Sequence, residues 1–175
     1  QGGIFLAVLD LLLPDAPEGE IVDLAMGRNI PSIIFTSDFD EMTRRNVFSR
    51  DIIDFIVKDR DAIDDIVALI DHLRKNRALK ALVVDDSVSF RTVTANMLQR
   101  YMLQTFTAES GARALEVLAE HPDISLVITD FEMPELDGVQ LCRTIRKTHN
   151  RDNLAIIAMS TVGKKTLSAR FLKNG

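Results

Sequence analysis

Four oxygen-bearing side chains follow three buried-type apolar runs in the second half of the chain. Asp85 and Asp86 follow the run 81–84, Asp130 follows 124–129, and Ser160 ends 155–160. Where strands lie parallel in an open sheet, ligands bind at their carboxyl ends. We therefore expect the three carboxylates and the hydroxyl to converge at one edge of a sheet.

Such a group of carboxylates has a defined chemistry. At about 4 Å, one pair of like charges costs roughly 4 kcal/mol at an effective dielectric near 20. The group must either raise a carboxyl pKa or recruit a hard divalent cation. Oxygen ligands favour Mg²⁺, with Mn²⁺ as an alternative ion. An Asp beside such an ion can accept a phosphoryl group, and the hydroxyl of Ser160 could then hydrogen-bond the acyl phosphate.

The elements that would position these groups alternate along the chain. Short apolar runs rich in Val, Ile and Leu favour strands buried on both faces of a parallel sheet. The runs are 4–9, 32–36, 52–57, 81–84, 103–107, 124–129 and 155–160. Between them lie stripes typical of helices with one buried face. One stripe comprises Ile63, Ile66, Val67, Ile70 and Leu73, and another Phe90, Val93, Met97 and Leu98. This alternation predicts an α/β doubly wound fold.

An internal repeat divides the chain. Residues 4–10 match residues 124–130 in pattern, and each segment has a proline four residues after its Asp, at Pro14 and Pro134. The offset of 120 residues is the size of a whole small domain. We expect two copies of one domain type, with the chain entering the first copy midway and leaving the second before its end.

Composition narrows the function classes. The net charge of −5 argues against nucleic-acid binding, which needs clustered Lys and Arg. Cys142 is the single cysteine, so an internal disulfide is impossible. The longest apolar run is too short for a membrane span, and no signal peptide pattern precedes it. We expect a cytoplasmic protein without a membrane partner.

The second copy resembles a response-regulator receiver domain in three segments that are in register. They are LVVDDS at 82–87, VITDFEMPELDG at 127–138 and IIAMST at 156–161. The resemblance implies a flavodoxin-like, five-stranded parallel sheet of order 2-1-3-4-5, with residues 78–175 covering strand 1 to helix 4. It makes Asp85 and Asp86 the Mg²⁺-binding acidic pair, Asp130 the phosphoacceptor and metal ligand, the backbone carbonyl of Glu132 a further ligand, and Ser160 the hydroxyl switch. The Lys that normally pairs with the phosphate would lie beyond Gly175.

The first copy, residues 1–77, resembles strand 3 to helix 5 of a receiver. The resemblance makes Asp10 a second phosphoacceptor, Thr36 its hydroxyl switch and Lys58 the phosphate-pairing Lys. Asp59 departs from the pattern, because a proline normally follows this Lys. The loop after Asp10 also looks like that of tandem-receiver proteins ending in a diguanylate cyclase (GGDEF) domain.

The resemblance implies two-component signal transduction. The partners would be a histidine kinase or histidine phosphotransfer protein, an output domain in the same full-length chain, and in one alternative a second copy in a homodimer. A receiver is a phosphoacceptor rather than a turnover enzyme, so the enzyme question stays open. A pseudo-receiver that only docks is the first alternative. The second is a haloacid-dehalogenase-like phosphatase, which needs an Asp where Leu12 and Glu132 stand. Asp85 and Asp86 could also merely cap a helix, and Asp10 could be a plain loop acid.

Overall fold

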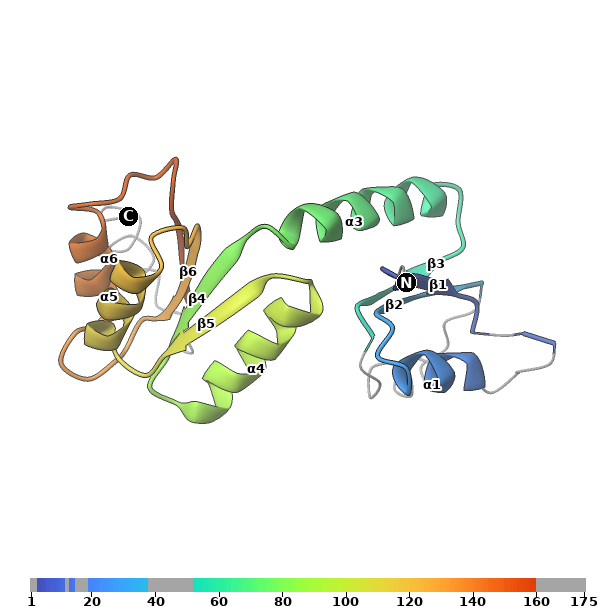
Figure 1. The fold of residues 1–175 in the computed structure, drawn as a ribbon, viewed down its shortest axis with the longest axis horizontal. Helices are drawn as coiled ribbons and strands as arrows, with labels where there is room; N and C mark the ends of the chain where they lie inside the picture. The colour runs from blue at the N-terminus through green and yellow to red at the C-terminus, as the bar shows by residue number, and fades with distance from the viewer. Residues whose placement is uncertain (1–2, 12, 15–18, 38–51, 160–175) are drawn as a thin grey trace. The chain divides into compact units, whose positions relative to one another are not determined.

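The chain divides into two compact units, residues 1–74 and 75–175. The computed structural model describes residues 3–11, 13–14, 19–37 and 52–159, and the two units are described separately below (Figure 1). Each unit holds one parallel sheet, of three strands in the first and four in the second. The α/β receiver-like architecture predicted from the sequence is confirmed, in two incomplete copies.

The sheet of the first unit has the order β1-β2-β3. The strands are β1 (Ala7–Leu9), β2 (Ser32–Thr36) and β3 (Asp54–Val57). Helix α1 (Glu20–Met26) connects β1 to β2, and α3 (Ala62–Asn76) follows β3 and continues to the start of the second unit. In the receiver frame these are strands 3, 4 and 5, and their observed order agrees with that frame.

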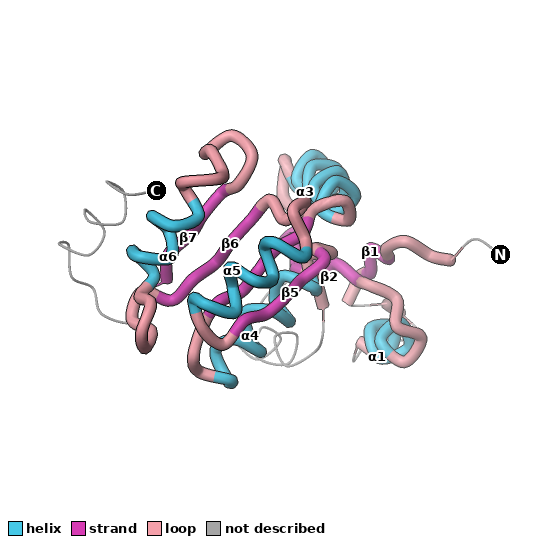
Figure 2. The backbone as a smooth tube through the Cα atoms, turned by 60° about the vertical axis from the view of Figure 1, so that its left-hand side comes forward, coloured by secondary structure: helices cyan, strands magenta, loops and turns pink. Residues whose placement is uncertain are grey.

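The sheet of the second unit has the order β5-β4-β6-β7, which is 2-1-3-4 in the receiver frame. Its strands are β4 (Lys80–Val84), β5 (Gln104–Ala108), β6 (Leu126–Asp130) and β7 (Ala155–Met159). Its helices are α4 (Val88–Arg100), α5 (Gly111–Glu120) and α6 (Gly138–Ile145). Helices α5 and α6 cover one face of this sheet and α4 covers the other (Figures 1 and 2).

The main core of the second unit lies between its sheet and the pair α5–α6. The central strands β4 and β6 contribute Leu82, Val84 and Val127, and α6 contributes Leu141 and Ile145, all of them fully buried or nearly so. Burial of each such side chain stabilises the fold by about 1.5–3 kcal/mol. The core thus fixes β4 beside β6, the two strands that end in the acidic residues.

Three of the four residues of the apolar stripe expected on the helix at 88–100 are exposed, whereas the fourth, Leu98, is half-buried. Phe90, Val93 and Met97 are 57%, 66% and 59% exposed, whereas the small Ala95 is buried. The helix approaches the sheet through its small residue, which leaves the larger apolar side chains on the outer side. In the first unit, Ile63 and Val67 of α3 are likewise exposed while Ile66 and Leu73 are buried.

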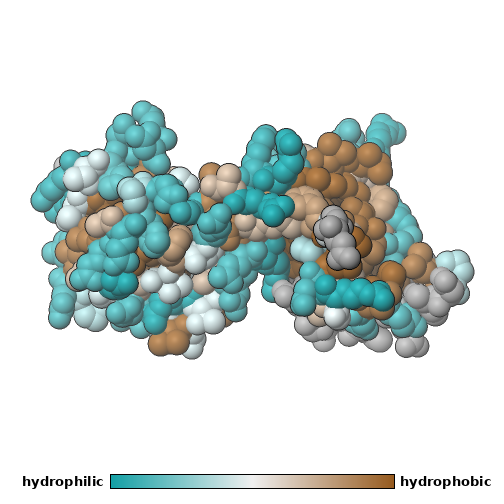
Figure 3. Space-filling model, viewed as in Figure 1, coloured by the Kyte–Doolittle hydropathy of each residue, from teal (hydrophilic) through white to brown (hydrophobic). Residues whose placement is uncertain are grey.

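Exposed apolar side chains are also prominent elsewhere on the first unit, where the space-filling view shows extensive hydrophobic surface (Figure 3). Ile4 is 64% exposed and Val8 of β1 is 41% exposed. A strand with an apolar side chain in water is typical of a sheet whose cover is incomplete. Among the residues described, no helix is long and apolar enough to cross a bilayer.

Candidate functional site

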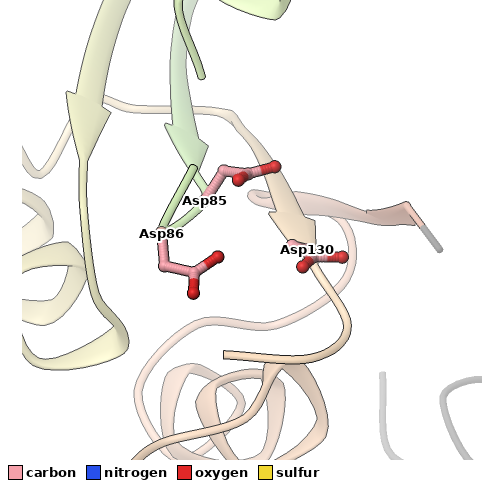
Figure 4. A group of neighbouring side chains, drawn as sticks. All are labelled: Asp85, Asp86 and Asp130. Carbon is pink, nitrogen blue, oxygen red and sulfur yellow. The ribbon is translucent and has the colours of Figure 1, made fainter. Parts of the chain in front are cut away.

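Strand register brings the acidic residues of the second unit together. Strands β4 and β6 pair in parallel with Val84 opposite Thr129, so Asp85 and Asp130 occupy the next positions on neighbouring strands. One carboxylate oxygen from each of Asp85, Asp86 and Asp130 lies within 4.8 Å of the others. Figure 4 shows the three side chains converging at the carboxyl ends of β4 and β6. The sequence prediction that these three residues meet at one sheet edge agrees with this geometry.

The turn from β4 into α4 fixes the first two carboxylates. Asp85 is 5% exposed, and its Oδ1 accepts a hydrogen bond of 2.8 Å from the backbone N–H of Ser87, the N-cap of α4. The backbone N–H of Asp85 donates to the carbonyl of Ala108 at the end of β5, at 3.2 Å. Asp86, at the tip of the turn, is exposed. Asp85 therefore supports the helix start with one oxygen and has a second oxygen for a cation.

Asp130 has an unusual electrostatic environment. Burial raises the pKa of its carboxyl, and the charges of Asp85 and Asp86 raise it further. Backbone N–H groups of Phe131 and Glu132 act against this rise, and the one from Phe131 lies 2.7 Å from Oδ1. A divalent cation at this edge would lower the pKa of Asp130 again, because it favours the ionised form of all three carboxyl groups. The residues present therefore fit a hard cation with oxygen ligands.

The segment after Asp130 is held at both ends. The N–H of Phe131 donates to the carbonyl of Met159 at 3.0 Å, and the N–H of Gly138 donates to the carbonyl of Phe131 at 3.1 Å. Asp137 then caps α6 through a reciprocal pair of hydrogen bonds with Gln140. The loop between these anchors carries the backbone carbonyl of Glu132, so its path past Asp130 is well defined.

The first unit brings together two of its three predicted residues. Lys58 Nζ forms an ion pair with Asp10 Oδ2, and the same ammonium lies 5.1 Å from the ring centre of Phe35. Thr36 is fully buried at the end of β2, and its backbone carbonyl accepts from the N–H of Lys58 at 2.8 Å. Strand β2 lies between the strands that precede Asp10 and Lys58, which explains why these side chains meet.

Two further residues bear on the site of the second unit: Ser160, which the sequence predicted, and Arg91, which it did not. Ser160 lies outside the described residues, so its role as hydroxyl switch stays a prediction. Arg91 was not among the predicted site residues, yet its guanidinium Nη1 donates to the backbone carbonyl of Asp85 at 2.5 Å. The signal available in the sequence was a cation in the first turns of the helix that starts after the acidic pair.

Comparison with known proteins identifies the family. Residues 81–175, more than half of the chain, match the model of the response regulator receiver domain. The chain therefore belongs to the response regulator receiver family, and this membership favours a receiver over the phosphatase alternative.

Two solved structures of two-component system response regulator/GGDEF domain proteins resemble the chain along almost its whole length. Each match covers 97% of this chain and 70% of the other, with TM-scores of 0.91 and 0.90 and identities of 39% and 40%.

Curated relatives match over a shorter length. The two-component response regulator ORR11 of Oryza sativa is 34% identical over 94 residues, which is 54% of this chain and 64% of that protein. A chemotaxis protein CheY homolog of Campylobacter jejuni is 35% identical over 98 residues, or 55% of this chain and 75% of that protein. The chain thus spans slightly less than two thirds of the length of ORR11.

Proposed function

We propose that this protein is a two-component response regulator in which Asp130 accepts a phosphoryl group in a Mg²⁺-dependent reaction. The observation that carries the proposal is the convergence of Asp85, Asp86 and Asp130, with one ligand oxygen of each within 4.8 Å of the others. The donor is a histidine kinase or a histidine phosphotransfer protein. Residues 1–77 and 78–175 are parts of two receiver domains of the full-length protein.

Oxygen atoms alone would hold the cation. Asp86 and Asp130 would supply carboxylate oxygens, Asp85 would supply the oxygen that does not bond Ser87, and the backbone carbonyl of Glu132 would be a further ligand. Mg²⁺ bound there, or Mn²⁺ in its place, would supply positive charge to offset the negative charge on the group in transfer. A set of a few carboxylates is the kind of site that Mg²⁺ takes beside phosphate oxygens.

The transfer itself uses the carboxylate of Asp130 as the nucleophile. A carboxylate oxygen forms a bond to phosphorus while the bond from phosphorus to the donor's imidazole nitrogen breaks, and its electron pair stays on that nitrogen. Asp130 must be ionised for this step. A cation beside Asp130 would favour this ionised form, because burial and the neighbouring carboxylates raise the pKa of Asp130.

The product carries a charge of about −2 at the end of β6. The hydroxyl of Ser160 follows β7, the neighbouring strand, and would hydrogen-bond the acyl phosphate. Such a contact would bias a pre-existing equilibrium between two conformations. The output is a domain elsewhere in the full-length protein, and the similarity to response regulator/GGDEF proteins supports a diguanylate cyclase in that role.

Asp10 is proposed as a second acceptor. The support is its ion pair with Lys58, which places a cation where it could bind a phosphoryl oxygen, and the main-chain bond from Lys58 to Thr36. The same pair could instead be a static contact in a unit that only docks. The two alternatives predict different behaviour of Asp10 toward a phosphodonor.

Intact mass spectrometry after incubation with phosphoramidate and Mg²⁺ tests the proposal. We expect Asp130→Asn to carry one phosphoryl group fewer than the wild type, and chelation of the metal to remove the group from the wild type. Asp10→Asn removes an acid at the corresponding strand end of the other unit and should keep the group on Asp130. If Asp10→Asn also carries one group fewer, Asp10 is a second acceptor; if its gain equals that of the wild type, the ion pair with Lys58 is a static contact. A wild-type protein that gains no phosphoryl group with Mg²⁺ would favour the docking pseudo-receiver.

A further inference from the structure

The side chain of Arg91 contacts the main chain of the acidic turn. It lies in α4, half-buried, and its guanidinium Nη1 donates to the backbone carbonyl of Asp85 at 2.5 Å. The backbone N–H of Arg91 donates to the carbonyl of Ser87 at 3.0 Å, which is the first hydrogen bond of α4 and does not depend on the side chain. The side chain therefore fastens the turn on the side before the exposed carboxylate of Asp86, and the helix itself begins on the other side.

The turn carries two carboxylates close to a third, so its backbone needs a contact that holds it in place. Asp85, Asp86 and Asp130 repel one another whenever no cation is bound, and the repulsion acts to spread the turn away from β6. Asp130 is fixed by its place at the end of β6 and by its bond from Phe131. Asp85 and Asp86 lie beyond the last residue of β4, so they depend on contacts made by the turn itself.

The contacts of the turn differ in kind. The N–H of Asp85 bonds to the carbonyl of Ala108, and both of these groups are neutral. The N–H of Ser87 bonds to the carboxylate of Asp85, so this contact occupies one carboxylate oxygen. The bond from Arg91 has an ionised donor, which makes it stronger and shorter than a neutral one. Because the bond from Arg91 ends on the main chain, it restrains the backbone without occupying a carboxylate oxygen of Asp85 or Asp86.

We propose that Arg91 is a positioning residue for the divalent-ion site. It holds the backbone at Asp85, so that the carboxylates of Asp85 and Asp86 stay within reach of Asp130 before the ion arrives. The ion then binds to a preformed arrangement instead of having to gather its ligands. This inference rests on the proposed function, because it assigns Arg91 to the same ion site.

Mn²⁺ is a suitable probe, since the electron paramagnetic resonance signal of free Mn²⁺ reports binding directly. We would titrate the purified wild type, Arg91→Met and Arg100→Met with Mn²⁺. Arg91→Met keeps an unbranched side chain in the helix and removes the donor. Arg100→Met makes the same change in the last turn of α4, away from the acidic turn. Loss of a residue that orients metal ligands weakens affinity by about 10- to 100-fold, and we expect this range for Arg91→Met alone.

Two readouts separate positioning from a merely structural role. We would measure the melting temperature without metal in parallel with the Kd for Mn²⁺, and we expect Arg91→Lys to give a Kd between those of wild type and Arg91→Met. An Arg91→Met protein that melts earlier but binds Mn²⁺ with wild-type affinity would overturn the inference. If Arg91→Met does not fold, Arg91→Gln is judged by the same criterion.

The outcome also distinguishes this inference from the proposed function. We expect Asp86→Asn to lose the Mn²⁺ binding that the wild type shows. This loss would assign the bound Mn²⁺ to the acidic site. A wild type that binds no Mn²⁺ at this site would contradict the proposed function and the inference with it. Wild-type binding that is lost in Asp86→Asn but unchanged in Arg91→Met would contradict the inference alone.

Discussion

Gly138 lies directly against the main chain of Asp130. A Cβ atom at position 138 would approach the carbonyl oxygen of Asp130 to 2.3 Å and the Cα of Phe131 to 3.2 Å. The first of these distances is too short for any real contact, and the atom it involves belongs to the backbone. The start of α6 and the end of β6 therefore fit together only when residue 138 has no side chain.

This contact predicts the effect of Gly138→Ala. Accommodating the methyl group must displace the end of β6 or the start of α6, and such overpacking costs about 1–3 kcal/mol of unfolding free energy. Denaturant unfolding measures the loss, and phosphoryl acceptance by Asp130 should fall in parallel because the acceptor moves. Gly3→Ala is the matched control, since a Cβ there meets no atom within 4 Å. Equal stability of the two variants would contradict the account.

Asp130→Asn should stabilise the protein in the absence of metal at neutral pH. Burial and the charges of Asp85 and Asp86 raise the pKa of Asp130 in the folded state. A carboxyl whose folded-state pKa is raised destabilises the fold when it is ionised, so the penalty is present above its folded pKa. The penalty vanishes below its unfolded value of about 3.9. Asp130→Asn should therefore raise the Tm measured at neutral pH without metal.

The pH and metal dependence of this gain provide the check. Melting curves of wild type and Asp130→Asn, recorded with chelator from neutral pH downward, should converge as the pH falls through the folded pKa of Asp130. Saturating Mg²⁺ should reverse the order, because it stabilises the wild type and binds the variant poorly. A variant less stable than wild type at neutral pH without metal would show that the carboxylate cluster carries no net repulsion.

Glu135 adopts a left-handed backbone conformation, with a φ of 64°, in the loop between Asp130 and α6. For a residue with a Cβ this conformation costs about 1–2 kcal/mol, whereas glycine adopts it freely. Glu135→Gly should therefore raise the unfolding free energy by about 0.5–1 kcal/mol after the larger chain entropy of glycine is counted. Glu132→Gly, in the same loop but outside the positive-φ residues, should lower it. Chemical denaturation of both variants tests this difference in sign.

Lys58→Met addresses the first unit. The side chains of Lys58 and Asp10 are 31% and 32% exposed, so solvent screens their ion pair. Such pairs contribute about 1 kcal/mol or less, and the Met side chain can still contact the Phe35 ring. We expect a loss of no more than about 1 kcal/mol, measured by denaturant unfolding, with Arg74→Met as a control for an exposed pair. A much larger loss would indicate that Lys58 mainly supports the fold and is not held ready for a phosphoryl group.

Much of the fold was accessible from the sequence because the strands are short apolar runs. The run at 32–36 coincides with β2, and that at 155–160 corresponds to β7, which ends at Met159. The run at 103–107 is shifted by one residue from β5, because the N–H of Leu103 bonds to the carbonyl of Leu98 and closes the end of α4. The run at 4–9 is longer than β1, whose pairing with β2 begins at Ala7 opposite Ser32.

The position of the acidic site could be predicted from the sequence. The hydrogen bonds that hold its backbone in place could not. Asp85, Asp86 and Asp130 directly follow or end strands, so topology alone brings them to one edge. The bond from Arg91 to the Asp85 carbonyl depends on a side-chain conformation that no spacing rule gives. The outward-facing stripe of α4 could not be foreseen either, because periodicity identifies an apolar face without showing whether another element covers it.

The most direct test of the central claim is to locate the phosphorylated residue chemically. Protein treated with phosphoramidate and Mg²⁺ would be reduced with borohydride, which converts an aspartyl phosphate to homoserine, and its peptides sequenced by mass spectrometry. We expect homoserine at residue 130, and we expect it to be lost when the metal is chelated. The absence of homoserine at residue 130, with the modification confined to residue 10 or found nowhere, would contradict the proposed role of Asp130.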